Sequence, residues 1–179
     1  MSKYRCVSGC CILNINPYTY SKTFNPLRRR NKAGVFIYDP KEDKTLLVQS
    51  RGHLWGPPKG TMEQGEAELA CAVREVKEET GLNVNHADFS DSITIHCKST
   101  YYYLEMSCCD VEVQSHIVDN DANGIGWIKT SCLEKGVQNG DILLSKHCIH
   151  VFKKFRNKTF GCLDVSNTYA EDIDQKRKV

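Results

Sequence analysis

The sequence lacks any uncharged apolar run of the roughly 18 residues that a membrane-spanning helix needs, so we expect no membrane partner. An apolar stretch does run from Cys6 to Ile15. It is short and contains Ser8, Gly9 and Asn14, so it predicts a strand rather than a signal peptide. Internal repeats and low-complexity segments are also missing, which argues against solenoids and fibrous arrays.

No C-x-x-C pair occurs among the ten cysteines, so a zinc ribbon has little support. Most of these cysteines lie in apolar stretches, where a free thiol behaves as a small hydrophobic side chain. We therefore expect a reduced, cytoplasmic protein rather than a secreted scaffold held by disulfides.

A strong excess of charge of either sign is missing too, since the net charge is only +2. Charge alone therefore does not indicate a nucleic-acid partner, and local patches have to decide. The 179 residues, 40% hydrophobic and 26% charged, are typical of a soluble globular protein. We expect a single domain at residues 1–165 and a flexible tail at 166–179, because the tail has little to bury.

Strands are predicted where short runs of β-branched and aromatic residues are bounded by turn residues. These runs are residues 5–15, 34–39, 44–51, 93–96, 101–106 and 124–128. The second and third form a hairpin around the turn that Asp39-Pro40 opens, and a loop runs from Gly52 to Gly65. Two helices are predicted from helical spacing of apolar residues, at 66–80 and 140–155.

The first helix carries an unusual cluster of like charges. On a helical wheel its apolar side consists of Leu69, Ala72, Val73, Val76 and Thr80. Glu75, Glu78 and Glu79 fall on an adjacent side at i, i+3 and i+4, where they repel one another and crowd the negative end of the helix dipole. A solvated acidic face is one interpretation; the other is a bound hard cation such as Mg²⁺, which prefers oxygen ligands and would offset both costs.

The segment that contains this helix resembles the signature of the Nudix hydrolases, G-x5-E-x7-R-E-U-x-E-E-x-G-U, in which U is a bulky aliphatic residue. The fixed positions are filled, over residues 60–82, by Gly60, Glu66, Arg74, Glu75, Val76, Glu78, Glu79, Gly81 and Leu82. The resemblance implies an α/β (α+β) fold in which a mixed β-sheet lies between helices in an α/β/α sandwich.

The resemblance also implies a reaction. Nudix enzymes cleave a nucleoside diphosphate linked to another moiety, with Mg²⁺ or Mn²⁺ as cofactor. By similarity, the metal ligands are Glu75, Glu79, Glu78 and Glu66, with Glu79 and Glu78 also among the catalytic residues. Arg74 is expected to pair with a carboxylate and orient it. Gly60 is expected to let the chain turn tightly into the loop, and Gly81 to take a positive φ after the helix.

Many members of the family use a further carboxylate on a loop before a strand that contains a tryptophan. Asp121, which precedes Trp127, is our candidate for this catalytic residue. Asp119 and Glu105 are alternatives, and an ordinary turn role for Asp121 is a third interpretation.

The substrate has to be inferred from residues outside the signature. "WGPPKG", residues 55–60, resembles the W-x-x-P-K-G entrance of asymmetric diadenosine tetraphosphate hydrolases and of mRNA-decapping enzymes. Candidate substrate-binding residues are therefore Lys59, Arg51, Trp55 and Tyr103. Packing in the core is the alternative for the last two, since large aromatic side chains are mostly buried.

Basic patches favour an RNA substrate. Residues 28–32 read "RRRNK", and the second predicted helix carries cationic side chains interleaved with Phe152 and Phe155. Lys153, Lys154 and Arg156 are our candidates for contacts to an RNA backbone, although a solvated helix face is the simpler interpretation.

These observations together predict a Mg²⁺-dependent (or Mn²⁺-dependent) hydrolase of a nucleotide polyphosphate. Its expected substrate is the 5′ cap of mRNA, with release of m7GDP, and the alternative is diadenosine tetraphosphate. A non-catalytic Nudix module that binds RNA or nucleotide is less favoured, because every signature glutamate is present.

Overall fold

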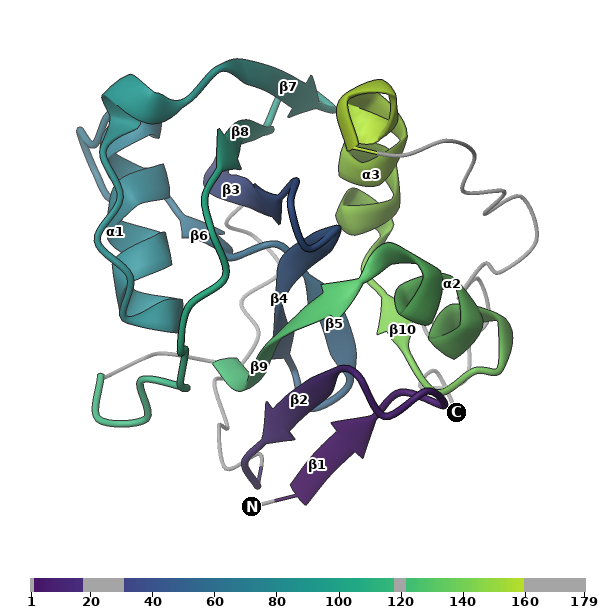
Figure 1. Cartoon of the computed structure of the whole chain (residues 1–179). Helices are drawn as coiled ribbons and strands as arrows, with labels where there is room; N and C mark the ends of the chain where they lie inside the picture. The colour runs from purple at the N-terminus through teal and green to yellow at the C-terminus, as the bar shows by residue number, and fades with distance from the viewer. Residues whose placement is uncertain (1, 18–30, 118–121, 160–179) are drawn as a thin grey trace, which may run out of the picture.

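The computed structural model describes residues 2–17, 31–117 and 122–159, with side chains as far as Phe155. Within these residues the chain forms one mixed β-sheet with helices on both faces (Figure 1). This arrangement confirms the sandwich architecture that the sequence predicts.

The described residues contain ten strands of one sheet. They are β1 (Ser2–Arg5), β2 (Ile12–Ile15), β3 (Lys32–Asp39), β4 (Lys44–Ser50), β5 (Leu54–Gly56), β6 (Lys59–Thr61), β7 (Asp91–Ile95), β8 (Ser99–Glu105), β9 (Ala122–Lys129) and β10 (Leu143–Leu144). The main order is β1-β2-β9-β4-β3-β8-β7, with β5 on β4, β6 on β3 and β10 on β5. The pairs β3–β8 and β5–β10 are parallel, and the others are antiparallel.

Helix α1 (Glu68–Thr80) covers one face of the sheet, and α2 (Thr130–Gln138) and α3 (Lys146–Thr159) lie on the other (Figure 1). A single 3₁₀ turn, η1 (His86–Asp88), follows α1. None of the helices in the described ranges is both long and apolar enough to cross a membrane.

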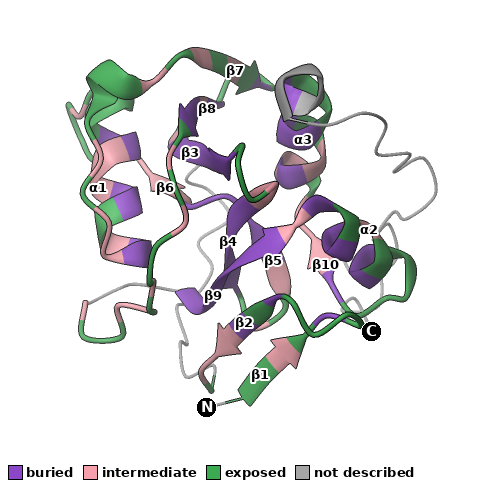
Figure 2. Ribbon diagram, in the orientation of Figure 1, coloured by how far each residue is buried: buried purple, intermediate pink, exposed green. Residues whose placement is uncertain are grey.

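The central strands are buried on both faces, so their sequences are continuously apolar rather than alternating. Along β3, Val35 and Ile37 pack in the cluster beneath α1, while Phe36 points to the opposite side. There the Phe36 ring meets Phe152 and Phe155 of α3, with ring centroids 5.0 Å and 5.6 Å apart. Figure 2 shows this buried band running through the middle of the sheet. Strand β3 is therefore the shared centre of two cores.

Several predicted elements change at their ends. The hairpin between residues 34–39 and 44–51 is confirmed as β3–β4, and the pairing of the two strands near 93–96 and 101–106 is confirmed as β7–β8. The single strand predicted at 5–15 is wrong, because Gly9 adopts a φ of 69° and turns the chain back between β1 and β2.

The helix predicted at 140–155 is wrong in its first part. Leu143 and Leu144 pair with β5, and α3 begins only at Lys146. The Ser145 hydroxyl accepts the backbone N–H of Cys148 at 3.2 Å, which is the contact of an N-terminal cap. Helix α2 and the short strands β5 and β6 have too weak a periodic pattern to stand out in the sequence.

Replacing Phe36 with alanine should destabilise the fold by about 3–5 kcal/mol, because the cavity would open among the aromatic rings of β3, β8 and α3. Urea unfolding followed by circular dichroism measures this change. Leu69→Ala is the matched control: this side chain is 39% exposed, and its loss should cost no more than about 0.5 kcal/mol. Equal losses in both variants would contradict the assignment of the core.

Candidate active site

Helix α1 presents a buried stripe to the sheet that includes two of the signature glutamates. Its apolar members are Cys71, Ala72 and Val76, with Thr80 at the end. Leu69, which the wheel placed in this stripe, is 39% exposed, so that prediction is wrong. It lies in the first turn of the helix, beyond the edge of the apolar cluster.

The C-terminal end of α1 follows the prediction. Gly81 adopts a φ of 77°, and its N–H donates to the Lys77 carbonyl at 2.9 Å. A left-handed cap of this kind favours glycine, since a side chain is strained at positive φ. The start differs, because α1 begins at Glu68 rather than at residue 66. Glu66 instead accepts the backbone N–H of Glu63 at 2.8 Å in the preceding turn.

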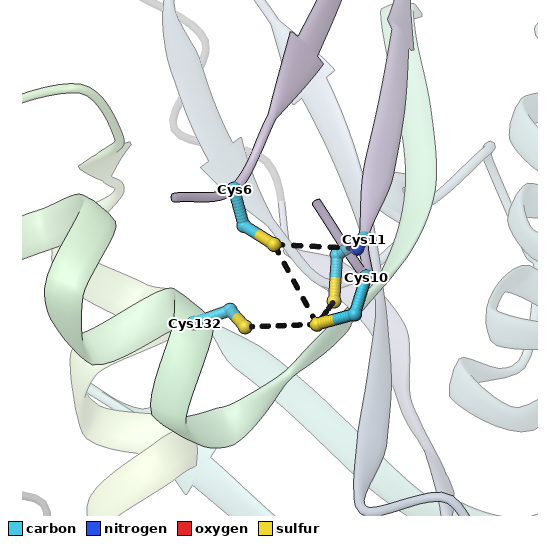
Figure 3. A group of neighbouring side chains, drawn as sticks. All are labelled: Cys6, Cys10, Cys11 and Cys132. Carbon is cyan, nitrogen blue, oxygen red and sulfur yellow. Dashed lines mark hydrogen bonds between the residues drawn. The ribbon is translucent and has the colours of Figure 1, made fainter. Parts of the chain in front are cut away.

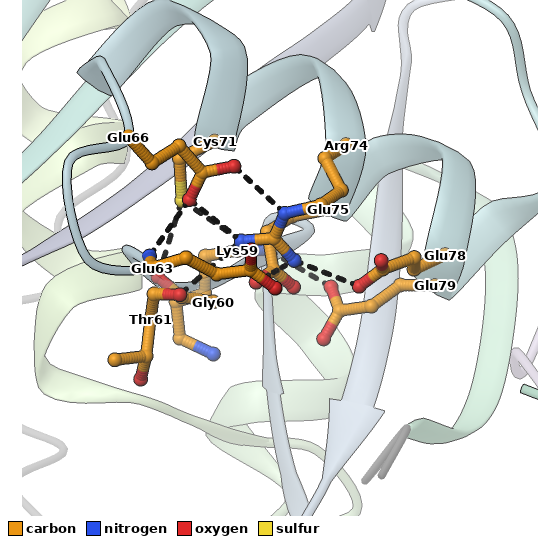
Figure 4. Close-up of polar contacts among 10 residues, drawn as sticks. All are labelled: Lys59, Gly60, Thr61, Glu63, Glu66, Cys71, Arg74, Glu75, Glu78 and Glu79. Carbon is orange, nitrogen blue, oxygen red and sulfur yellow. Dashed lines mark hydrogen bonds and ion pairs between the residues drawn. The ribbon is translucent and has the colours of Figure 1, made fainter. Parts of the chain in front are cut away.

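Glu75 and Glu79 lie at the junction of α1 with β6 and are only 9% and 4% exposed (Figure 4). The backbone N–H of Lys59 donates to Glu79 Oε2 at 2.8 Å. The "PPKG" loop therefore holds Glu79 through its main chain. This main-chain contact was not predicted from the sequence, where Lys59 was considered only as a side chain that binds substrate.

Gly60 is required for space rather than for a tight turn. It lies inside β6 opposite Ala33 and is not one of the glycines with a positive φ. A Cβ built on Gly60 would overlap the carboxyl group of Glu75. The missing side chain lets the buried carboxylate lie directly against the strand, and this replaces the turn role expected above.

Arg74 joins three of the glutamates with one guanidinium group (Figure 4). Its Nε and Nη2 donate to the two carboxylate oxygens of Glu66, at 2.8 Å and 2.9 Å, in a bidentate pair. Its Nη1 donates to Glu75 Oε1 at 2.9 Å and to Glu78 Oε2 at 2.8 Å. Nη2 also reaches the Thr61 carbonyl at 3.2 Å and the sulfur of Cys71 at 3.5 Å. Arg74 therefore sets the positions of Glu66, Glu75 and Glu78 together.

The charge of the cluster is only partly balanced. Hydrogen bonds from Arg74 lower the pKa of Glu66. Burial raises the pKa of Glu75, against the opposing effect of Arg74, so its ionised form lacks part of the positive charge that would stabilise it. Three carboxylates around the guanidinium, with Glu79 beside them on the Lys59 N–H, form a donor set of hard oxygen atoms, which suits Mg²⁺ or Mn²⁺.

The residues present therefore fit a divalent ion. Glu75 and Glu79, with Glu78 and Glu66 at their sides, would hold it. When bound, such an ion neutralises phosphate oxygens and lowers the pKa of a coordinated water. Within the chain, the hydrogen bonds from Arg74 and from the N–H of Lys59 keep the carboxylates ionised and oriented.

Two candidate substrate-binding residues lie in the core instead of the site. Trp55 is 2% exposed and Tyr103 is 1% exposed, and both belong to the apolar cluster beneath α2 and α3. Neither ring offers a face to a nucleotide base, so packing, the alternative stated for both, describes their positions. Arg51 is exposed in the turn between β4 and β5, with a φ of 55°.

Of the three candidates for the catalytic carboxylate outside the signature, the structure describes only Glu105. Asp121 and Asp119 lie outside the described residues. Glu105 ends β8 and pairs with Tyr38 of β3. Lys59 pairs with Gly34, four positions earlier on β3, so the two levels are roughly 13 Å apart along the strand. Its carboxylate accepts the Tyr103 hydroxyl at 2.9 Å. The structure therefore places Glu105 away from the glutamate cluster.

A neutral histidine lies near the Lys59 side of the site. The Tyr101 hydroxyl and His147 Nδ1 are 3.1 Å apart. Burial, together with the charges of Lys59 and Lys32, lowers the pKa of His147 to about 4, so the ring is uncharged at neutral pH. Burial raises the pKa of Tyr101, so its hydroxyl stays protonated beside the ring. From the sequence, His147 was assigned only to a basic helix. Its contact with Tyr101 could not be predicted, because the two residues are 46 positions apart and no local pattern links them.

The candidate RNA-binding lysines are on the solvent side of α3. Lys153 and Lys154 are exposed, while Phe152 and Phe155 are buried against β3 and β8. The phenyl rings are therefore core residues and not part of a surface for bases. The side chain of Arg156 and the residues Arg28, Arg29 and Arg30 lie outside the described part of the chain.

Replacing Glu79 with glutamine should weaken Mn²⁺ binding by about 10–100-fold, since the amide keeps an acceptor for the Lys59 N–H but loses the negative charge. Titration followed by electron paramagnetic resonance measures the affinity without relying on turnover. Glu68→Gln, at the exposed start of α1, is the control and should bind as the unchanged protein does. Undiminished affinity in Glu79→Gln would remove Glu79 from the ligand set.

Comparison with known proteins agrees with this geometry. The model of the NUDIX domain matches residues 28–142. "Putative hydrolase 111R" of Invertebrate iridescent virus 3 is 36% identical over 152 residues, which cover 80% of this chain and 88% of that protein. The E. coli dihydroneopterin triphosphate pyrophosphohydrolase has the same fold, with a TM-score of 0.52 and 17% identity over 71% of this chain and 94% of that one.

Shorter matches reach two other groups. The asymmetrical bis(5′-nucleosyl)-tetraphosphatase of Caenorhabditis elegans is 38% identical over 77 residues, 40% of this chain and 51% of that protein. The mRNA-decapping enzyme subunit 2 of Arabidopsis thaliana is 42% identical over 54 residues, 30% of this chain and 14% of that protein. The chain thus spans about half of the first and a small part of the second. With three of the signature glutamates held by Arg74 and the family model covering most of the described sheet, the chain belongs to the Nudix family and is a pyrophosphohydrolase.

Proposed function

We propose that this hydrolase cleaves the pyrophosphate linkage at the 5′ cap of RNA, releasing m7GDP, with Mg²⁺ or Mn²⁺ held by Glu75, Glu79, Glu78 and Glu66. The observation that carries the choice of substrate is the position of α3 relative to Lys59. A small dinucleotide needs only the glutamate cluster and its loop, whereas a polymer also needs a surface that continues beyond them.

Helix α3 supplies such a surface. Its first turn carries His147, which contacts the Tyr101 hydroxyl, and Tyr101 and Lys59 both pair with Gly34 of β3. Lys153 and Lys154 follow six and seven positions later on the exposed side, roughly 10 Å along the helix axis. A strand of RNA that leaves the site along α3 would meet these ammonium groups through its phosphates, which gives affinity that does not depend on sequence.

The chemistry assigned to the chain follows from the cluster. Glu79 and Glu78 are the proposed catalytic carboxylates, with Asp121 as the candidate outside the signature. Arg74 is a positioning residue, because it acts by orienting and ionising the glutamates rather than by touching substrate. Lys59 contributes a point charge toward a polyphosphate.

Diadenosine tetraphosphate is the second candidate substrate. The same "WGPPKG" segment leads into the site, and a tetraphosphatase is among the relatives as well as a decapping enzyme. A purely binding role is less favoured, since all four signature glutamates are present, three of them held by Arg74 and Glu79 by the N–H of Lys59.

Direct assays separate the two substrates. Cap-labelled RNA should yield m7GDP, and diadenosine tetraphosphate should yield little ATP and AMP. The charge reversal Lys153→Glu with Lys154→Glu should raise KM for capped RNA by about 10-fold and leave kcat unchanged, because these residues are expected to contact only the RNA backbone. Lys77→Glu on the exposed face of α1 is the matched control. Rapid hydrolysis of the dinucleotide with none of capped RNA would reject the proposed substrate and keep the hydrolase.

The pH dependence tests Arg74. Arg74→Gln removes the contact that lowers the pKa of Glu66 and opposes the raised pKa of Glu75, so both carboxyl groups should hold their protons to higher pH. Since the ionised forms are the active ones, the acid limb of kcat/KM should move to higher pH, and activity at neutral pH should fall by about 10–100-fold. Lys77→Gln removes the same charge from the exposed side of α1 and should leave the profile in place. An unmoved acid limb in Arg74→Gln would show that Arg74 has only a structural role.

A further inference from the structure

Four cysteine sulfur atoms meet where the first hairpin touches α2 (Figure 3). Cys6, Cys10 and Cys11 come from the turn between β1 and β2, and Cys132 comes from the first turn of α2. The sulfur of Cys10 lies 3.6 Å from that of Cys6, 3.6 Å from that of Cys11 and 3.5 Å from that of Cys132. All four sulfurs lie within 4.8 Å of one another.

These distances match the size of a tetrathiolate metal centre. In tetrahedral zinc the Zn–S bond is about 2.3 Å, which places the sulfurs about 3.8 Å apart. The three separations from Cys10 are slightly shorter than that value and every pair lies within 4.8 Å, so small side-chain rotations are enough to reach it. A disulfide would need two of these sulfurs to approach to about 2.05 Å, well inside the observed separations.

Backbone N–H groups face two of the four sulfurs. The backbone N–H of Cys11 donates to the Cys6 sulfur at 3.3 Å, and the N–H of Lys129 donates to the Cys11 sulfur at 3.3 Å. Cys132 lies in the first turn of α2, at the positive end of the helix dipole. Backbone donors of this kind orient metal ligands and offset their charge.

The turn itself is shaped to present three ligands from six residues. Gly9 has a φ of 69°, and its N–H donates to the Cys6 carbonyl at 2.8 Å, which folds Cys10 back over Cys6. The resulting C-x3-C spacing falls within the range of zinc ligands. Cys6, Cys11 and Cys132 are buried, whereas Cys10 is exposed and leaves a route for an ion from solvent.

We propose that Cys6, Cys10, Cys11 and Cys132 bind one zinc ion that ties the N-terminal hairpin to α2. Each coordinating thiol gives up its proton to solvent as the zinc–sulfur bond forms. Four protein ligands leave no open position, which is the pattern of a structural rather than a catalytic ion. The site is separate from the glutamate cluster, because Cys6, Cys11 and Cys132 belong to the core on the α2 and α3 side, while the glutamates lie on α1. Soft thiolates select zinc, and the carboxylates select Mg²⁺ or Mn²⁺.

Metal analysis of the full chain, purified with its thiols reduced, tests this site. Elemental analysis should find about one zinc per chain, and cobalt substitution should give the intense visible absorption of tetrahedral Co²⁺ bound by thiolates. Cys10→Ser should lose both signals, and its exposure makes this the cysteine of the four least needed for packing. Cys109→Ser, which changes an exposed thiol outside the cluster, is the matched control and should keep both.

Thermal unfolding gives a second measurement that does not depend on hydrolysis. A zinc chelator should lower the Tm of the unchanged protein and of Cys109→Ser, but not that of Cys10→Ser, which has already lost the ion. Reduced protein that takes up neither zinc nor cobalt would overturn the proposal. So would a disulfide between any two of these cysteines in peptides from protein that binds no zinc.

Discussion

The structure depends on the burial of negative charge between α1 and the sheet. Glu75 and Glu79 are almost as inaccessible as the apolar residues beside them, and an uncompensated buried carboxylate costs several kcal/mol. Arg74 and the main-chain N–H of Lys59 supply part of the compensation, and a divalent ion is suited to supply the rest. Burial of Glu75 also requires glycine at position 60, because any Cβ there would push the Glu75 carboxyl group away.

Strand β3 connects this cluster to the other face of the sheet. Its last residues pair with β4, whereas Lys32, Ala33 and Gly34 pair with β6 on one side and with the start of β8 on the other. Gly34 has no Cβ where the Pro58 carbonyl and Lys59 cross it, so the loop can lie directly on the strand. One short segment therefore positions Lys59 beside the glutamates and also the strand of Tyr101, which contacts His147 of α3.

Features set by neighbours along the chain could be predicted from the sequence. The glutamates at i, i+3 and i+4 share one side of a helix whatever it packs against, and Gly81 caps that helix through its own backbone. Features set by distant contacts could not be predicted. The burial of Trp55 and Tyr103, the exposure of Leu69 and the reason for Gly60 depend on which strand or helix lies opposite. The cysteines are the clearest example, because the search for C-x-x-C pairs overlooked a turn completed by Cys132, 122 positions from Cys10.

The two proposed metal sites lie against the same sheet but use different kinds of ligand. Carboxylates would hold a hard cation at α1, and thiolates would hold a softer one where β2 meets the start of α2. Strand β2 pairs with β9 through Asn14 and Ile15, and Lys129 at the end of β9 donates to Cys11. A zinc tie at the cysteines would therefore fix one end of the β2–β9 contact. Strand β9 pairs along its whole length with β4. The tie would thus stabilise the sheet on which α1 and its glutamates pack, from a site that is separate from those glutamates.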